Sequence, residues 1–413
     1  MRRILDTIGQ SKFILGRGVI DGTGTGLRKG EGILIRDGII IAVGTPESVK
    51  PSDAVRIDAG TSIIVPGFID SHTHVTIRPG EGDQHGNMLK PHVWQAIRGV
   101  ENLHRMIASG VTTAKSMTEE ADIDLEYRSA IERGEIVGPK LLASGRGFSP
   151  PGGHGSAGGG VAGVENLRAA VRERIEKGVD HIKIFTTGGV SSEQSSLNAS
   201  LYSAEEIAAI VREAAAAGLK VSAHAHGGPG LDLAVANGIH SIEHGSMINK
   251  ESATEMVKRG TWLVMTSSIL FHPTGIEQGD ANSPAIMAKV KEGRKEAERS
   301  AQIVREAGVR IAVGTDSMHG LIGYEMQRLV EYGWTSAEAL MAATRSGAEL
   351  IGLDDVGTLQ AGKRADLVLL RANPLEDIKA VYDIAGVYRS GVEIVTGEGL
   401  VRVPASAQSF LKN

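Results

Sequence analysis

The chain of 413 residues has no cysteine, few aromatic residues and no long apolar run. The lack of cysteine excludes disulfides and thiolate ligands, so any metal must be held by nitrogen and oxygen atoms. No apolar stretch approaches the length of a membrane span. The formal net charge is −5 and no run of lysine and arginine stands out. The charge pattern therefore favours neither nucleic acid nor an anionic membrane as a partner.

The N-terminal sequence lacks the features of an exported protein. Arg2 and Arg3 are not followed by the apolar run of a secretory signal, so we expect a cytoplasmic protein. We also expect it to act on a small molecule and to assemble as a homo-oligomer. The aromatic share of 4% gives no indication of a pocket for a large ring.

The two ends of the chain share one sequence pattern and the middle has another. Up to about residue 65, stretches such as GEGILIRDGIIIAVG alternate apolar residues with turn signals, and this pattern returns from about residue 358. Between them, short apolar strands alternate with alanine-rich amphipathic helices, which is typical of βα units around a parallel sheet. We count eight strands, ending near residues 72, 113, 145, 185, 224, 244, 267 and 316.

These patterns predict an α/β protein with two parts. Eight βα units of this length suit a (β/α)8 TIM barrel, which we place at residues 66–357. Residues 1–65 and 358–413 then build a small β-sandwich domain together, with the barrel inserted between them.

The segment VPGFIDSHTHV, residues 65–75, places His72 and His74 near the end of the first barrel strand. Residues two apart in a strand point to the same face, so the two imidazoles lie side by side, as metal ligands do.

Other polar residues fall where later barrel strands end. Each has a structural alternative: a histidine in the core, a lysine whose stem is buried, or an aspartate that caps a helix. Those alternatives do not explain why all of them fall at the carboxyl ends of strands, where barrel enzymes have their active sites. The residues are Lys183, His224, His244 and Asp316.

With PGFIDSHTH, DHIKIFTTGGVSS, HAHGG and the closing GTLQAGKRADLVLL, the chain resembles the amidohydrolase superfamily in its two-metal form. It looks closest to the imidazolonepropionase-related branch. That branch includes Xaa-Arg/Xaa-Lys-type dipeptidases or carboxypeptidases and hydrolases of N-acyl amino acids. By this resemblance one metal ion is held by His72, His74, Lys183 and Asp316, and the other by Lys183, His224 and His244.

The lysine has a specific chemical reason to be there. A protonated ammonium group would repel two nearby divalent cations. A buried lysine loses its proton readily and can add CO2 to form a carbamate, an anion that bridges both ions. We therefore expect Lys183 to be N-carboxylated. Zinc is the first choice of metal, with manganese, cobalt and nickel as alternatives.

The resemblance also implies a mechanism and a substrate class. A hydroxide that bridges the metals attacks an amide carbonyl, while Asp316 acts first as general base and then as general acid. His226 is a candidate donor to the developing oxyanion, although several dipeptidase-like members carry tyrosine at its place. His154, His226 and Arg146, with Arg78 as a further candidate, are expected to contact a substrate carboxylate.

The expected substrate is a dipeptide or an N-acyl amino acid. The alternative is a cyclic amide, as in imidazolonepropionase, or a carbamate or urea. Two rival classes fit less well. A one-metal deaminase needs no lysine at residue 183 and usually carries a glutamate close to the histidine of the fifth strand, but VSAHAHGG around His224 has none. A non-enzymatic descendant should have lost ligands, yet all six are present.

Two loops are expected beside the site. SPPGGHGSAGGG, residues 149–160, lacks the Gly-Lys-Ser/Thr ending of a phosphate-binding loop and is read as a mobile loop that carries His154. Residues 77–94 are long and show no pattern, as a lid over the mouth of a barrel would.

Overall fold

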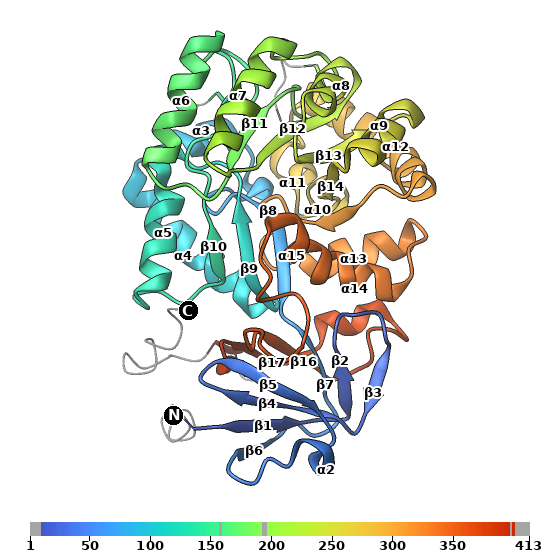
Figure 1. Cartoon of the computed structure of the whole chain (residues 1–413). Helices are drawn as coiled ribbons and strands as arrows, with labels where there is room; N and C mark the ends of the chain where they lie inside the picture. Colours follow the sequence, from blue (N-terminus) through green and yellow to red (C-terminus); the bar gives the residue numbers. More distant parts are fainter. Residues whose placement is uncertain (1–9, 157–158, 192–195, 397–398, 401–413) are drawn as a thin grey trace.

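The computed structural model describes residues 10–156, 159–191, 196–396 and 399–400. Its larger part is an α/β fold of TIM-barrel type (Figure 1). Eight parallel strands form two sheets, with the orders β10-β9-β8 and β11-β12-β13-β14-β15. The strands are β8 (Phe68–Thr73), β9 (Val111–Ser116), β10 (Lys140–Leu142), β11 (Ile182–Phe185), β12 (Val221–Gly227), β13 (Ser241–Met247), β14 (Trp262–Met265) and β15 (Ile311–Val313).

Backbone contacts join the two parallel sheets on both sides. Phe148, just after β10, forms a parallel bridge with Ile184 of β11. The Asp316 amide, just after β15, donates to the His72 carbonyl of β8 at 2.9 Å. The order of the eight strands around this part therefore follows the chain, as the sequence predicts.

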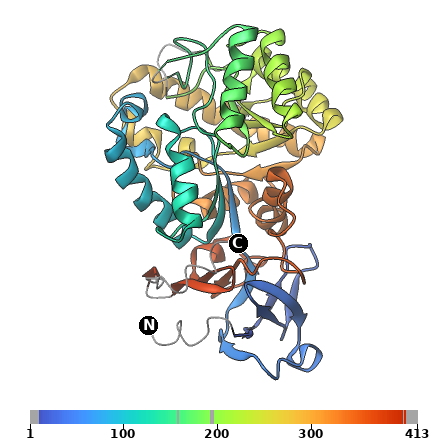
Figure 2. The same ribbon diagram turned by 60° about the vertical axis from the view of Figure 1, so that its left-hand side comes forward.

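Helices follow most of the strands and cover the outside of the sheets (Figure 2). Those in the strand-rich middle are α3 (Gln84–Met88), α4 (His92–Ala108), α5 (Ile123–Glu132), α6 (Val164–Glu176), α7 (Ala204–Ala216), α8 (Gly228–Ala236), α9 (Lys250–Arg259), α10 (Ser268–Phe271), α11 (Ile276–Asp280), α12 (Pro284–Ala307), α13 (Ile322–Glu331), α14 (Ser336–Ala342) and α15 (Arg345–Ile351). Short 3-10 helices lie at η1 (Pro79–Glu81), η2 (Glu120–Asp122) and η3 (Ile378–Tyr382).

Helix α7 shows how local sequence sets these boundaries. Ser203 and Glu206 form a reciprocal capping box at its start, which satisfies two backbone N–H groups that a helix start leaves free. Ile207 and Ile210 lie on the buried face, against the sheet. An apolar stripe at helical spacing therefore stabilises the packing of the helix on the barrel strands.

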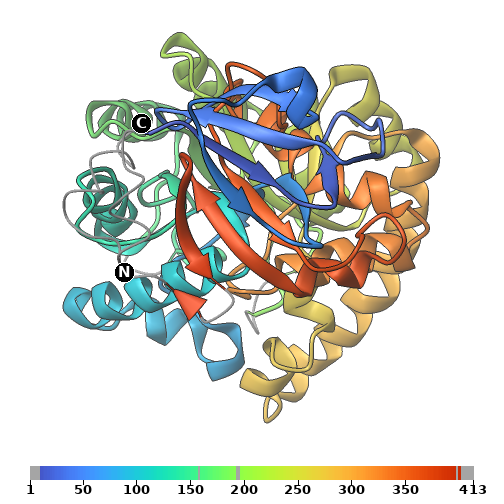
Figure 3. The same cartoon turned by 90° about the horizontal axis from the view of Figure 1, so that it is seen from below.

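Strands from the two chain ends combine in a seven-stranded sheet with the order β19-β18-β17-β16-β7-β2-β3. A four-stranded sheet with the order β5-β4-β1-β6 lies beside it (Figure 3). The strands are β1 (Lys12–Leu15), β2 (Gly18–Ile20), β3 (Leu27–Lys29), β4 (Gly32–Arg36), β5 (Ile39–Gly44), β6 (Val55–Asp58), β7 (Ile63–Pro66), β16 (Leu367–Leu370), β17 (Ile384–Arg389), β18 (Val392–Thr396) and β19 (Gly399–Leu400), with the short helix α2 (Pro46–Val49) after β5.

Both sheets contribute to one buried apolar cluster. It contains Ile14 and Ile33 of the four-stranded sheet and Ile64, Leu367 and Leu369 of the seven-stranded one. We infer that the two sheets form a composite β-domain, while the boundaries at residues 65 and 358 stay predictions.

The chain passes from this β-domain into the barrel strands across a single residue. β7 ends at Pro66 and β8 begins at Phe68. Between them, the Gly67 amide donates to the Asp366 carbonyl at 2.9 Å. A Cβ atom at Gly67 would lie 2.2 Å from Oγ1 of Thr112, so only glycine fits this crossing. The small sheets therefore lie at the end where the parallel strands begin.

Residues 77–94, which show no pattern in the sequence, contain η1, α3 and the start of α4. The carboxylate of Asp83 accepts from the Gly86 amide and caps the start of α3. This capping residue is a local signal for the helix, although no apolar pattern accompanies it. The N-terminal segment with Arg2 and Arg3 lies outside the described residues. Across the described ranges, no helix is both long and apolar enough to cross a membrane.

Candidate metal centre

Three of the predicted ligands meet where β8 and β15 end. His72, His74 and Asp316 each offer one ligand atom, and these atoms all lie within 4.8 Å of one another. Nε2 of His72 lies 3.3 Å from Oδ1 of Asp316, and Nε2 of His74 lies 3.5 Å from the same oxygen. Asp70 holds the two strand ends in register, because its carboxylate accepts from the Thr315 amide at 3.0 Å and hydroxyl at 2.6 Å.

The hydrogen bond at Nδ1 of each imidazole determines whether the Nε2 atom that faces Asp316 carries a proton or a lone pair. Nδ1 of His72 lies 2.7 Å from Oε2 of Glu243, and Nδ1 of His74 lies 3.1 Å from the Thr118 carbonyl. Both partners are acceptors, so both Nδ1 atoms carry the proton and both Nε2 atoms carry a lone pair. Two lone pairs and a carboxylate oxygen therefore converge, an arrangement that a bound cation stabilises.

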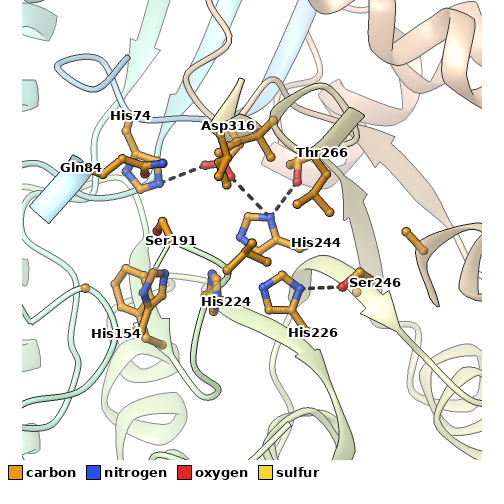
Figure 4. Close-up of a pocket in the computed structure, with 18 of the residues that line it drawn as sticks. His74, Gln84, His154, Ser191, His224, His226, His244, Ser246, Thr266 and Asp316 are labelled. Carbon is orange, nitrogen blue, oxygen red and sulfur yellow. Dashed lines mark hydrogen bonds and ion pairs between the residues drawn. The ribbon is translucent and has the colours of Figure 1, made fainter. Parts of the chain in front are cut away.

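Two more histidines face the same space from β12 and β13 (Figure 4). The rings of His224 and His244 lie 4.5 Å apart between centroids, and His244 lies 4.8 Å from His72. Nε2 of His224 donates to the Gly188 carbonyl at 3.1 Å, which leaves Nδ1 as its free lone pair. Nδ1 of His244 lies 2.7 Å from the Thr266 hydroxyl and 3.7 Å from Oδ2 of Asp316.

Lys183 lies in β11 with 1% of its surface exposed. Its Nζ atom has no hydrogen-bond partner among the described residues and lies 5.1 Å from the centre of the Phe185 ring. Burial lowers the pKa of Lys183 to about 8, although Glu243 and Asp316 act in the opposite direction. A buried amine without a partner, with a pKa this close to neutrality, fits the carbamate that the sequence predicts.

Two of the six predicted ligands have strained backbones. His244 has a φ of 75° and Asp316 a φ of 46°, both in the left-handed region that side chains other than glycine seldom adopt. Such strain persists where the surrounding structure imposes it, and it concentrates at functional sites.

The surroundings keep the imidazoles neutral and the aspartate charged. Burial lowers the pKa of His74 to about 3 and holds the pKa values of His224 and His244 well below the ordinary value. Burial alone would raise the pKa of Asp316, but the neighbouring His72, His74 and Lys183 outweigh it and lower this pKa. Neutral imidazole and ionised carboxylate are the forms that bind metal.

A cavity of about 500 Å³ opens onto this cluster. His74, His154, His224, His226, His244 and Asp316 line one part of it. Its size lies within the range typical of small-molecule sites. The remainder is lined by aliphatic side chains, by polar residues and glycines, and by the rings of Phe185, Phe271 and Tyr332.

The comparisons with known proteins agree with this arrangement. Residues 63–394 match the model of the amidohydrolase family. The chain belongs to the amidohydrolase family. It is 30% identical to ochratoxinase of Aspergillus niger over 92% of this chain and 86% of that protein. It is 24% identical to imidazolonepropionase of Rhizobium rhizogenes, over 82% of this chain and 85% of that one.

Solved structures are also similar to this chain. A prolidase solved in complex with N-methylphosphonate-L-proline superposes with a TM-score of 0.85 and 30% identity, covering 93% of this chain and 99% of that one. Amidohydrolases generally bind divalent metal ions, and the four imidazoles, one carboxylate and one unpartnered lysine fit such ions.

Two further histidines of this amidohydrolase line the cavity. Nδ1 of His226 lies 2.7 Å from the Ser246 hydroxyl, while its buried Nε2 has no partner in the part of the chain that the structure describes. His154, from the loop after β10, packs its ring 4.6 Å from that of His224 and 5.5 Å from that of Phe185. Both side chains point toward the centre of the labelled cluster (Figure 4).

The two predicted arginines lie outside the cavity. Nε of Arg146 lies 3.5 Å from Oε1 of Glu120, and the guanidinium also donates to the Gly159 carbonyl. Arg78 pairs with Glu101 at 2.8 Å. The structure therefore gives no support to Arg146 or Arg78 as the group that receives a substrate carboxylate.

A buried polar chain that was not predicted from the sequence lies beneath the ligands of this amidohydrolase. Lys115 of β9 donates to the Ser222 hydroxyl at 2.7 Å, and Ser241 bonds both Ser222 (2.9 Å) and Oε1 of Glu243 (2.6 Å). Glu243 accepts in turn from His72. Burial alone would raise the pKa of Glu243, but Lys115 and His72 outweigh it and lower this pKa to about 2. Charged residues inside apolar strands, in GVTTAKS and SIEHG, were the available signal.

Proposed function

We propose that this amidohydrolase cleaves an amide bond in a dipeptide or an N-acyl amino acid, with two divalent ions at the candidate metal centre. The observation that carries the proposal is that ring nitrogens with a free lone pair and a carboxylate oxygen converge at the floor of a cavity. His72, His74 and Asp316 would hold one ion, and His224 and His244 the other. Lys183, as a carbamate, would contact both, and zinc suits this donor set.

Bound divalent ions would lower the pKa of a water molecule and polarise the substrate carbonyl. Asp316 then takes the proton of the attacking water and passes it to the leaving amine, since its carboxylate is ionised and faces the cavity. His226 donates from Nε2 to the carbonyl oxygen as negative charge develops there, because the Ser246 hydroxyl can donate to its Nδ1.

The substrate class is supported by the relatives. The prolidase ligand joins a methylphosphonate to the nitrogen of L-proline, at the place where a dipeptide has its carbonyl. An amide whose leaving amine belongs to an amino acid has the same layout. With Arg146 placed elsewhere and Nε2 of His226 assigned to the carbonyl oxygen, His154 is the group proposed to contact the free carboxylate of that amino acid.

The test is a screen of the metal-loaded protein against dipeptides, N-acyl amino acids, cyclic amides and carbamates, each compared with its form lacking a free carboxylate. We expect turnover of dipeptides or N-acyl amino acids, and its loss when the carboxylate is amidated. Equal rates on acid and amide, or turnover of cyclic amides alone, would replace this proposal with an imidazolonepropionase-like activity. The homo-oligomer and the cytoplasmic location stay predictions.

A further inference from the structure

The cavity has an apolar wall that the chemistry at the metal centre does not use. The wall consists of Val190, Met265, Ile269, Leu270, Ile276 and Ala301, each buried and each lining the cavity. These residues come from the loop after β11, the end of β14, helix α10, the start of α11 and helix α12.

The wall is firmly built. Val190, Ile269, Leu270 and Ile276 belong to a core cluster that also contains Val290 of α12. A packed cluster resists collapse, so the hollow keeps its shape without a ligand. Arg294 of α12 donates to the Leu270 carbonyl at 2.6 Å and ties the helix to this wall.

The charges around the cavity are unevenly distributed. Asp316 and five of the lining histidines are at the metal centre, and His85 lies in α3. No lysine, arginine or glutamate is found among the described residues that line the cavity. A charged group placed against the apolar wall would lose its hydration without gaining a partner. An uncharged apolar group would instead remove its own surface and that of the wall from water.

We propose that the substrate of this amidohydrolase carries a bulky, uncharged aliphatic or aromatic group on one side of the scissile amide, and that the apolar wall binds it. The inference rests on the proposed function and narrows it to amides with such a group. It makes Ala297 and Ala301 specificity-determining residues. They lie one helical turn apart on α12 and line the cavity, where a larger side chain would fill it.

The first test measures binding without turnover. Zinc-loaded protein is titrated by calorimetry with straight-chain hydroxamic acids of two to eight carbons, whose head group chelates metal while the chain grows. We expect the affinity to rise by roughly threefold to fourfold per methylene group until the hollow is filled. A carboxylate at the far end of the longest chain should abolish the gain. An affinity independent of chain length, or one indifferent to the terminal carboxylate, would overturn the proposal.

The second test fills the cavity beside the apolar wall. Ala297→Leu should flatten the dependence on chain length, while Ala288→Leu, at an exposed position of the same helix, should keep it. An unchanged dependence in Ala297→Leu would contradict the assignment. N-acylglycines of the same chain lengths are then tried as substrates, and we expect kcat/KM to rise with chain length. If none is cleaved and no dipeptide is cleaved, while hydroxamate affinity still rises with length, the proposed amide hydrolysis fails and the binding site stands.

Discussion

Replacing Glu243 with glutamine removes one negative charge beneath the metal centre and leaves the shape of the side chain almost unchanged. In the native protein Oε2 of Glu243 accepts from Nδ1 of His72 at 2.7 Å, with both side chains fully buried. This bond fixes which nitrogen of His72 carries the proton and increases the electron density at the other. The substitution therefore acts on the metal without touching it.

The size of the effect follows from the two kinds of hydrogen bond. A bond to a charged acceptor contributes about 1.5 to 3 kcal/mol and a neutral one about 0.5 to 1.5 kcal/mol. Glutamine can keep a neutral bond to His72, so the loss is about 1 to 2 kcal/mol. Partners of this kind typically change metal affinity by about 10-fold to 100-fold. We expect a zinc affinity lower by about tenfold or more, because Lys115 also loses its anion.

The assay is competition for zinc between metal-free protein and a chromophoric chelator. Glu393→Gln is the matched control, because Glu393 lies in β18 of the small sheets and interacts with Tyr388 and Lys12 rather than with a predicted ligand. The control should bind zinc like the wild type. Equal zinc affinity of Glu243→Gln and the wild type would refute the reasoning that the buried polar chain supports the metal centre.

Three further predictions concern single residues. Lys183→Ala should abolish turnover and lower the zinc content measured by elemental analysis, with short carboxylic acids restoring part of the rate; normal activity would exclude a bridging carbamate. Asp316→Asn should keep most of the metal yet lose about 100-fold or more in kcat, because asparagine cannot accept a proton; an unchanged kcat would mean that another group is the base. Burial raises the pKa of Glu119 from 4.5 to about 8, so the folded protein binds this proton more tightly than the unfolded chain. That stabilisation is complete below pH 4.5 and is lost as the pH rises through about 8. In this window Glu119→Gln should therefore remove a slope of up to about 1.4 kcal/mol per pH unit from the unfolding free energy measured by denaturant titration, and parallel curves would contradict the shift.

The order of the barrel strands and the gathering of polar residues at their ends could be predicted from the sequence. The reason is geometric: parallel strands in consecutive βα units end at the same edge, so His72 and Asp316 meet although 243 residues separate them. Alternation along a strand was sufficient to pair His72 with His74.

The same alternation concealed Glu243. Neighbouring strand residues point to opposite faces, so Glu243 and His244 should not both face the metal centre. They do so because His244 adopts a φ of 75°, which breaks the alternation. No local pattern predicts that conformation for a histidine, since the surrounding packing imposes it. The apolar wall could not be predicted either, because its residues come from one loop, one strand and three helices that meet only in the folded protein.

The single residue between β7 and β8 connects events at the two ends of the molecule. A fluctuation that unpairs β7 from β16 pulls on the strand that carries His72 and His74. Metal bound to those histidines opposes it with a free energy that grows with the logarithm of metal concentration, about 4 kcal/mol at a thousand times Kd. Chelating the metal should therefore speed amide hydrogen exchange in β16 and β17, although no predicted ligand lies in either strand. With metal bound as proposed, the small sheets would open less often and expose fewer sites to proteases.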